Sequence, residues 1–283
     1  MQVPALPAVM VEPVVRAALL EDLGRAGDIT TDAIVPAEAR TRTVLVARQP
    51  GVLAGLDYAL TAFRLMDPAI EAIPQRHDGS RLAAGDTIAT IAGPARGILT
   101  AERTGLNFLC HLSGIASATH TVVEAIRGHR AQVCCTRKTM PGLRAAQKYA
   151  VRVGGGSNHR FGLDDAVLIK DNHVAIAGGV REAVERARAA VGHLVKIELE
   201  VDTLAQLERA LTLRVDAVLL DNMGPEMLRE AVGIVDGRAI TEASGRITPS
   251  TAPAVAATGV DLISIGWLTH SATVLDIGLD HDG

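Results

Sequence analysis

Basic side chains are concentrated in one segment of this 283-residue chain, although its formal net charge is −4. The segment runs from Cys135 to Arg160 (CTRKTMPGLRAAQKYAVRVGGGSNHR) and contains no acidic residue. Arginine offers a bidentate fork to a carboxylate or phosphate, and lysine offers a point charge. We therefore expect Arg137, Lys138 and His159–Arg160, together with Lys170 further along, to bind an anion with several negative groups.

Two features of the same segment need separate interpretations. The glycine triplet 154–156 lets the backbone approach a ligand closely, and its amides could face an anion. Arg144, Lys148 and Arg152 are spaced by four residues, which places them along one side of a helix beginning near Gly142. We expect these three to form a solvated helix face, whereas Arg137, Lys138 and Lys170 abut apolar strands and are candidates for the site.

Two acidic residues end consecutive apolar runs. Glu200 is the penultimate residue of VKIELEV, and Asp221 is the last residue of DAVLLD. Carboxylates beside cations suit Mg²⁺ bound to phosphates, because Mg²⁺ prefers oxygen ligands. Glu198 and Asp202 share the side-chain direction of Glu200 if the strand continues that far. The alternative is that these acids simply form salt bridges with the nearby lysines.

The elements that must position these residues alternate between strand and helix. Six apolar runs predict strands: AQVCC (131–135), AVLIK (166–170), VKIELEV (195–201), DAVLLD (216–221), RAITEAS (238–244) and DLISIG (261–266). Helical segments follow most of them, which is typical of parallel βα units. Six or more units favour a closed α/β barrel, with a doubly wound sheet as the alternative. In a barrel the carboxyl ends of the strands meet at one face, so the polar residues there become neighbours.

The first hundred residues have a different pattern. Residues 10–20 predict an amphipathic helix, TRTVLVARQPGVLAG predicts strand, turn and strand, and DTIATIAG predicts another strand. Residues 98–126 predict one long helix. It contains Gly105 and Gly114, which weaken a helix unless packing requires them.

Composition and missing motifs exclude several classes. Aromatic residues make up only 2% of the chain, which with the net charge argues against nucleic-acid binding. No G-x-x-x-x-G-K-[ST] loop is present, and no G-x-G-x-x-G follows a strand. The N-terminus lacks a basic segment and is broken by prolines, and no apolar run reaches membrane length, so we expect no membrane association. Cys110, Cys134 and Cys135 have no zinc-type spacing and suit a reducing compartment, so we expect a cytoplasmic protein.

Several segments taken together resemble the quinolinate phosphoribosyltransferases, also called nicotinate-nucleotide pyrophosphorylases (carboxylating). They are TRKTMPGLRAAQKYAVRVGGGSNHR, LIKDNH, IELEVDT, LLDNM, EASG and the ending GWLTHSATVLDIGLD. EDLGRAGDITTDAIVP and LTAERTGLNFLCHLSGIASAT fit the N-terminal half of that family. The resemblance extends over about residues 20–280. The combination of TRKT-PG, the GGG–HR segment and KDNH is highly specific.

The resemblance implies both a reaction and a fold. The reaction joins quinolinate to phosphoribosyl pyrophosphate and releases pyrophosphate and CO₂, giving nicotinate mononucleotide for NAD biosynthesis. The fold would be an N-terminal α/β sandwich domain (1–110) followed by an incomplete, seven-stranded α/β barrel (111–283), whose last residues could pack back on the first domain. Since only six strands are clear, VRVGG (151–155) is a candidate for the seventh.

The resemblance also implies roles for particular residues. The substrate-binding set would be Arg103, Thr136, Arg137, Lys138, His159, Arg160, Lys170, Glu200, Asp221, Ser244, Gly245 and Gly266. Lys138, Glu200 and Asp221 would be catalytic, with the two acids facing Mg²⁺ directly or through water or pyrophosphate. Arg103 would reach the site of a neighbouring subunit, so the working unit would be a homodimer or a higher oligomer. Ser244, Gly245 and Gly266 would hold the ribose 5-phosphate.

One departure and three alternatives accompany this interpretation. The residue after Ser244-Gly245 is usually Gly or Asn in the family, whereas this chain has Arg246, which either strengthens phosphate binding or points to solvent. A related pyrophosphorylase-like protein encoded with molybdate transport shares the motifs, but Arg103, Arg160 and Lys170 favour quinolinate. Nicotinate phosphoribosyltransferase would need fewer cations, and a non-enzymatic binding protein would be expected to lose Lys138 or the acids.

Overall fold

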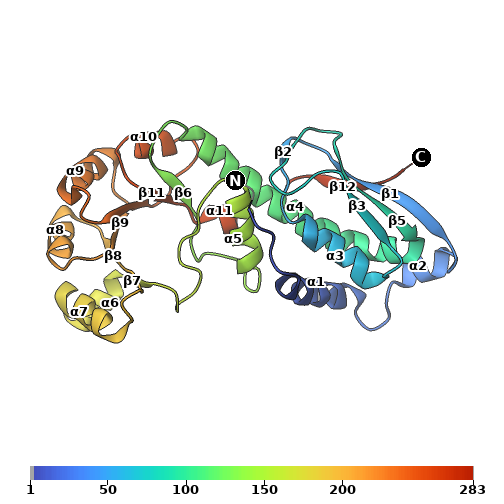
Figure 1. The fold of residues 1–283 in the computed structure, drawn as a ribbon, viewed down its shortest axis with the longest axis horizontal. Coiled ribbons are helices and arrows are strands. Elements are labelled where there is room, and N and C mark those ends of the chain that lie inside the picture. Colours follow the sequence, from blue (N-terminus) through green and yellow to red (C-terminus); the bar gives the residue numbers. More distant parts are fainter. Residues whose placement is uncertain (1–2, 283) are drawn as a thin grey trace. The chain divides into compact units, whose positions relative to one another are not determined.

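The computed structural model describes residues 3–282 of the chain. These residues form two compact units, drawn in Figure 1. Unit 1 comprises residues up to 120, 139–155 and 268 onward, and unit 2 comprises residues 121–138 and 156–267. Residues 139–155 and 268 onward therefore belong to unit 1. The predicted domains, 1–110 and 111–283, place these two segments in the C-terminal domain.

Unit 1 is built on a four-stranded antiparallel sheet. Its order is β12-β1-β5-β3, with β12 Ile277–His281, β1 Arg40–Ala47, β5 Thr87–Pro94 and β3 Glu71–Pro74. The C-terminal strand β12 pairs with β1, so the end of the chain does pack into the N-terminal sheet. The predicted strand, turn and strand after residue 40 is also present. However, the short β2 (Gly51–Val52) pairs with β4 (Arg81–Leu82) rather than with β1.

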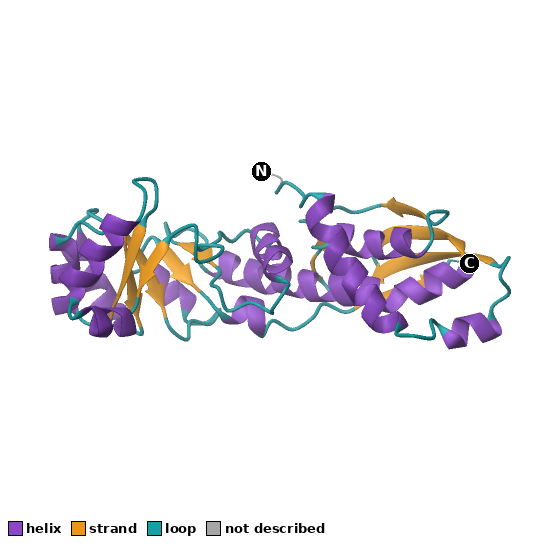
Figure 2. Ribbon diagram, turned by 90° about the horizontal axis from the view of Figure 1, so that it is seen from below, coloured by secondary structure: helices purple, strands orange, loops and turns teal. Residues whose placement is uncertain are grey.

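Helices cover one face of this sheet, as Figures 1 and 2 show. They are α3 (Leu56–Met66) and the first part of α4 (Ala95–Ala125), and α1 (Ala8–Leu23) packs on α3. The short helix α2 (Ile29–Ile34) follows α1. Later in the chain are α5 (Arg144–Val153) and α11 (Trp267–His270). The predicted helices at 10–20 and 98–126 are confirmed. Burying apolar side chains such as Phe63 and Leu109, both fully buried, is the main stabilising term of such a layered core.

Unit 2 contains the parallel sheet that the alternating pattern predicts. Its order is β6-β11-β10-β9-β8-β7. The strands are β6 Gln132–Cys134, β7 Val167–Ile169, β8 Ile197–Val201, β9 Ala217–Asp221, β10 Ile240–Ser244 and β11 Leu262–Ser264. Every predicted run thus contains a strand. Leu199, Val218 and Leu220 are fully buried, because helices cover one face of the curved sheet.

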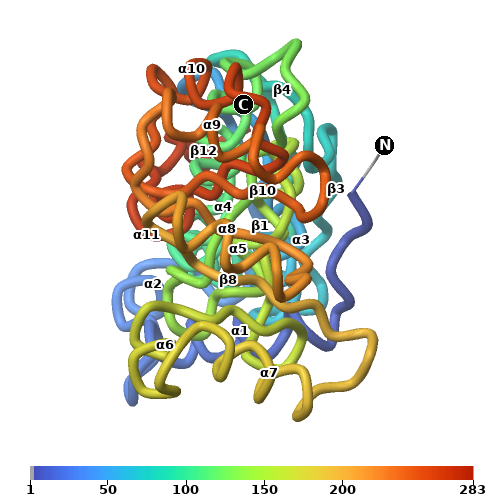
Figure 3. Tube along the Cα trace, turned by 90° about the vertical axis from the view of Figure 1, so that its left-hand side faces the viewer, coloured from blue at the N-terminus to red at the C-terminus, as the bar shows by residue number. Residues whose placement is uncertain are grey.

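The helices of unit 2 follow the strands in order. They are α6 (Asp171–Ala177), α7 (Val180–Ala190), α8 (Leu204–Thr212), α9 (Pro225–Val235) and α10 (Ala252–Ala256). Figure 3 traces the chain through them, each lying next to the one before. Local sequence explains two of their starts. The Thr203 side chain accepts a hydrogen bond from the Gln206 amide at the first turn of α8, and Pro225 stands in the first turn of α9.

Two predictions from the basic segment are wrong. Residues 151–155 do not form a seventh strand, because Val151–Val153 end helix α5. Beyond the six strands, the described residues add only a single bridge that pairs Ser157 with Cys134. Lys148 is not on a solvated face either: its residue is 1% exposed, whereas Arg152 is exposed as predicted. The helical spacing was correct, but the consecutive residues 146–151 of α5 are all buried, so burial extends around most of the helix.

Within residues 3–282, no helix combines the length and the apolar character needed to cross a bilayer.

Candidate active site

Strand register brings the polar residues of unit 2 onto one face of its sheet. Glu200 is directly opposite Leu219, and Leu219 is opposite Glu242. One step further toward the carboxyl ends, Asp221 is opposite Ser244, and Ser244 is opposite Ser264. Directly opposed residues point to the same side of a sheet, and so do residues two apart in one strand. These side chains therefore share one concave surface.

That surface is the wall of a cavity of about 420 Å³. The lining residues are Thr136, Arg137, Lys138, His159, Arg160, Leu168, Lys170, Glu200, Leu219, Asp221, Glu242, Ser244 and Ser264. The volume is within the range typical of small-molecule sites. Most of the predicted site residues are thus brought together, at the carboxyl ends of the strands.

Three predicted residues are not in this wall. Arg103 belongs to unit 1, where it is exposed and lines a different cavity of about 300 Å³ with Asp22 and Asp28. Gly245 directly follows the wall residue Ser244, and Gly266 comes just after β11.

The arginines of the cavity keep donors available. Among the described residues, the buried Nε atoms of Arg137 and Arg160 have no hydrogen-bond partner. Arg160 is held in place by its Nη1, which donates to the Ala166 carbonyl over 3.0 Å. Burial, with Arg137 nearby, lowers the pKa of Arg160. Buried donors without partners are costly, so a cavity that keeps two of them is suited to an anion.

Lys170 is positioned by the turn that follows β7. It is the N-cap residue of α6, and its backbone amide donates to His173 Nδ1 over 2.9 Å. Its Nζ lies 3.1 Å from Glu200 Oε2. The salt bridge that sequence reasoning kept as an alternative for the acids is therefore present at Glu200.

Asp221 has a different environment. Its Oδ2 accepts a hydrogen bond of 2.6 Å from the Asn222 side chain. Asn222 itself has φ 54°, and its backbone amide donates to the Ser244 carbonyl over 2.9 Å. This link fixes the ends of β9 and β10 relative to each other, and it presents the carboxylate of Asp221 beside the hydroxyl of Ser244.

The turn after β10 explains why Arg246 is an unusual residue there. Gly245 has φ 111°, and a Cβ on it would lie 2.3 Å from Asn222 Oδ1. Arg246 follows with φ 49°, a left-handed conformation that glycine and asparagine adopt most easily. The side chain of Arg246 is exposed and is not part of the cavity wall, which is the arrangement expected if it points to solvent.

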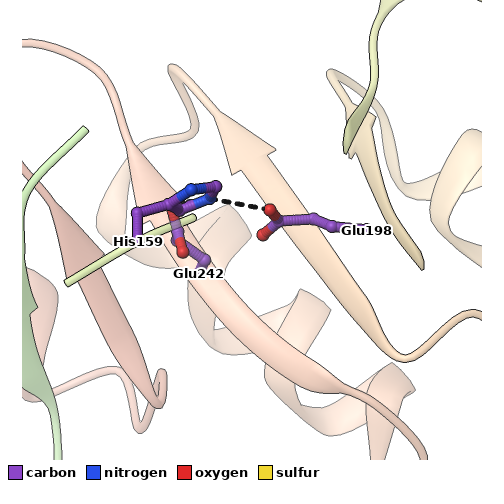
Figure 4. A group of neighbouring side chains, drawn as sticks. All are labelled: His159, Glu198 and Glu242. Atoms are coloured by element: carbon purple, nitrogen blue, oxygen red, sulfur yellow. Dashed lines mark hydrogen bonds and ion pairs between the residues drawn. The ribbon is translucent and has the colours of Figure 1, made fainter. Parts of the chain in front are cut away.

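Two acidic residues behind the cations form a buried cluster with His159, drawn in Figure 4. His159 Nε2 is 2.8 Å from Glu198 Oε2 and 3.7 Å from Glu242 Oε1. Burial and the neighbouring Glu198 raise the pKa of Glu242 to about 7. Sequence analysis considered Glu198 but missed Glu242. The signal was present, because Glu242 stands two residues before Ser244 in a strand and so shares its face.

Comparisons with known proteins agree with the motifs. Two family models match the chain: "Quinolinate phosphoribosyl transferase, N-terminal domain" over residues 28–113, and "Quinolinate phosphoribosyl transferase, C-terminal domain" over residues 115–280. The nicotinate-nucleotide pyrophosphorylase [carboxylating] of Mycobacterium leprae is 48% identical, and the match covers 94% of this chain and 95% of that protein.

A solved structure is similarly close. The crystal structure of NadC from Streptococcus pyogenes is 42% identical, with a TM-score of 0.94, and the match covers 99% of this chain and 100% of that one. The structure of the nicotinate-nucleotide pyrophosphorylase from Francisella tularensis is 39% identical, also with a TM-score of 0.94, covering 100% and 99%.

Proposed function

Since the chain belongs to the quinolinate phosphoribosyltransferase family, we propose a division of roles among the residues of its cavity. The family reaction is the decarboxylating transfer of phosphoribosyl from phosphoribosyl pyrophosphate to quinolinate, and it is a step of NAD biosynthesis. This chain is an enzyme of that class. Its two substrates together carry two carboxylates, a phosphate and a pyrophosphate, which accounts for the gathering of cations.

Arg137 and Arg160 bind the carboxylates of quinolinate, with Lys170 beside them. The observation that carries this role is the pair of buried Nε atoms without partners in the cavity wall. A planar dicarboxylate can accept from both guanidinium groups at once. Lys170 can leave Glu200 for the substrate, because its side chain is 50% exposed and its ion pair is only weakly stabilising.

His159 contributes differently from a cation. Its Nδ1 accepts the backbone amide hydrogen of Arg160 over 2.8 Å, so Nε2 carries the proton and donates it to Glu198. The ring is then neutral, and it orients both the Arg160 backbone and the Glu198 carboxylate. Its role in quinolinate binding is to shape the wall between these groups.

Phosphoribosyl pyrophosphate is assigned to other residues of the cavity wall and to the turns that follow it. Lys138 and Thr136 face the pyrophosphate, with the Thr136 hydroxyl accepting the Lys138 backbone amide over 3.0 Å. Ser244, Gly245 and Gly266 take the 5-phosphate. Glycine at position 245 leaves backbone amides accessible to an anion.

Mg²⁺ is the proposed cofactor, with Glu200 and Asp221 as its protein partners. The two residues fit it, because both carboxylates line the cavity from neighbouring strands and offer hard oxygen donors. When bound, the ion would neutralise charge on the leaving pyrophosphate. The same carboxylates favour positive charge that develops on the ribose carbon as the bond to pyrophosphate breaks. The pyridine nitrogen attacks that carbon, and its positive charge then stabilises the electron pair left on the ring when CO₂ departs. That ring carbon then takes up a proton from solvent to give nicotinate mononucleotide.

Arg103 is proposed to act in the site of a second subunit. It is exposed on α4, and large apolar side chains are exposed on the neighbouring helices: Leu20 is 63%, Ile29 69% and Ile34 73% exposed. Exposed apolar surface of this kind is typical of protein–protein contacts.

We also propose a cytoplasmic location, in keeping with the three free cysteines, which suit a reducing compartment.

A product assay tests these roles. Nicotinate mononucleotide is measured by chromatography after incubation with phosphoribosyl pyrophosphate, Mg²⁺ and quinolinate, with nicotinate in a parallel reaction and a chelator in a third. We expect product from quinolinate alone and none with the chelator. Arg137→Ala should lower kcat/KM for quinolinate by about tenfold to a hundredfold, since a charged hydrogen bond contributes about 1.5–3 kcal/mol.

The matched control is Arg186→Ala, on the exposed face of α7. It should behave like the parent protein. Equal activity of the Arg137 and Arg186 variants would remove Arg137 from the quinolinate pocket, and persistent turnover without divalent metal would remove Mg²⁺ from the proposal.

A further inference from the structure

The cluster of His159, Glu198 and Glu242 contains two buried carboxyl groups at the inner end of a basic cavity. Glu242 is 1% exposed and Glu198 is 8% exposed. Glu242 lines the cavity, yet among the described residues its Oε1 has no hydrogen-bond partner. Its other oxygen, Oε2, lies 3.9 Å from the Cys134 thiol, a weak donor. Two ionised carboxylates without adequate donors would be unfavourable here.

The hydrogens available to this cluster can be counted. The Arg160 amide donates to His159 Nδ1, so the imidazole has only one hydrogen, on Nε2, and that hydrogen lies toward Glu198 at 2.8 Å. Glu242 is 3.7 Å from the same nitrogen, beyond a hydrogen bond. Glu198 is therefore the carboxylate that the histidine stabilises more strongly. Glu242 has only the weaker help of the more distant His159, the Ser264 hydroxyl and the Cys134 thiol, which does not offset its burial and the neighbouring Glu198.

A metal ion is a poorer occupant of this cluster than a proton. The ligating atoms lie within 4.8 Å of one another, which is close enough for a cation. A metal-bound imidazole, however, normally donates from its other nitrogen, and here that nitrogen faces the N–H of Arg160. Binding a metal at Nε2 would leave the ring without any hydrogen or require the Arg160 amide to move.

We infer that Glu242 is a proton store for the cavity: it is protonated when the dicarboxylate substrate is bound, and it takes up a proton as that substrate binds. The inference rests on the proposed use of this cavity for the two carboxylates of quinolinate. The proton comes from solvent and adds to a carboxylate oxygen of Glu242, and the reverse occurs on release. Glu242 thereby acts as a positioning residue that sets the charge of the wall.

The groups that face Glu242 explain why substrate binding leads to proton uptake and not to proton release. Glu198, His159, the Ser264 hydroxyl and the Cys134 thiol lie closest. The cavity wall also carries Arg137, Lys138, Arg160, Lys170, Glu200 and Asp221. In the empty cavity the cations favour the ionised carboxylate. A bound dianion neutralises them and adds negative charge, so protonated Glu242 becomes more favourable. Binding and protonation are then reciprocally coupled, so the substrate binds more weakly as pH rises above the range where Glu242 ionises.

Calorimetry with phthalate tests this directly. Phthalate presents the two adjacent carboxylates of quinolinate on a ring that lacks the reacting nitrogen. Titrations at pH 7 in buffers with different ionisation enthalpies give the number of protons taken up per bound phthalate. We expect about half a proton in the parent protein, because a group half ionised at that pH becomes fully protonated. We expect nearly none in Glu242→Gln, which imitates the protonated carboxyl.

Kinetics give the second measurement. KM for quinolinate should rise about tenfold between pH 7 and pH 8.5 in the parent protein and by less than about twofold in Glu242→Gln. Glu226→Gln, an exposed change on α9, should retain the parental pH dependence. A purely structural role for Glu242 would change activity without changing the proton count.

Several results would overturn the inference. They are zero proton uptake by the parent protein, equal uptake by Glu242→Gln, or no phthalate binding at all. The parental proton count decides the question even if the variant does not fold. Nicotinate mononucleotide formation at pH 6 is measured first, because its absence would contradict the proposed function rather than the proton store.

Discussion

Two glycines of helix α4 provide a paired test of how unit 1 is packed. Both stand inside a long helix, where glycine is less favourable than alanine by about 0.8–1.0 kcal/mol. A Cβ added at Gly105 would lie 3.4 Å from Phe63 Cε2, an ordinary contact. A Cβ added at Gly114 would lie 2.2 Å from the Thr273 carbonyl oxygen and 2.9 Å from Val274 Cα, which are backbone atoms. The same substitution should therefore have opposite effects.

We expect Gly105→Ala to raise the free energy of unfolding by about 0.5–1 kcal/mol, through helix propensity alone. Gly114→Ala should displace the segment that leads into β12, including the hydrogen bond of 2.9 Å from the Leu275 amide to the Cys110 carbonyl. Overpacking costs about 1–3 kcal/mol and a lost hydrogen bond about 1 kcal/mol. After the gain in propensity, the net destabilisation should be about 2 kcal/mol.

Urea denaturation followed by far-ultraviolet circular dichroism measures both variants, with calorimetric Tm as the second readout. The two variants should differ by about 3 kcal/mol, or several degrees in Tm. If Gly114→Ala were as stable as Gly105→Ala, the C-terminal segment would not be packed closely on α4, and the explanation for a glycine at that position would be refuted.

Three further changes test other parts of the structure. Glu242 has a pKa raised from 4.5 to about 7, so the folded state holds a proton that the unfolded chain releases, and parental stability should fall as pH rises from 4.5 through 7. Glu242→Gln should lack this dependence and gain about 3 kcal/mol relative to the parent across that range, measured by urea denaturation at each pH. Arg246→Gly should raise the free energy of unfolding by about 1 kcal/mol, because glycine adopts the left-handed backbone conformation without strain. KM for phosphoribosyl pyrophosphate should stay within about twofold, and a larger change would mean that the Arg246 side chain contacts the phosphate. Tyr149→Phe removes the hydrogen bond of 2.8 Å from the hydroxyl to Asp78 and should destabilise unit 1 by about 1–3 kcal/mol, with an unchanged midpoint counting against that contact.

The sequence identified the strands of unit 2 and the face of the sheet that carries the candidate active site. Four of the six apolar runs carry a polar residue at or next to their end, and parallel strands place those ends together. Residue type and order along the chain therefore suffice to group Lys170, Glu200, Asp221 and Ser244. The motifs identified the family, because their residue types and spacing extend over most of the chain. Local rules also found the long helix α4 in spite of its glycines.

Burial and charge state required the tertiary structure. The four-residue spacing on α5 predicted which side chains share a face of the helix. It could not predict that Lys148 is buried, because periodicity carries no information about what packs against a helix. Similarly, strand alternation could place Glu242 beside Ser244, but its pKa depends on Glu198, which is far away in sequence.

The sequence by itself thus determined the order of the strands along the chain, the polar residues at their ends and the family to which the chain belongs. These properties follow from local periodicity and residue type, which can be read from the sequence without knowing the three-dimensional structure. Only the tertiary structure decided that His159 lies between Glu198 and Glu242, that two arginines keep buried donors without partners among the described residues and that Glu242 has no hydrogen bond at Oε1. Those properties depend on distances between residues from different strands and loops, and such distances exist only once the sheet has formed.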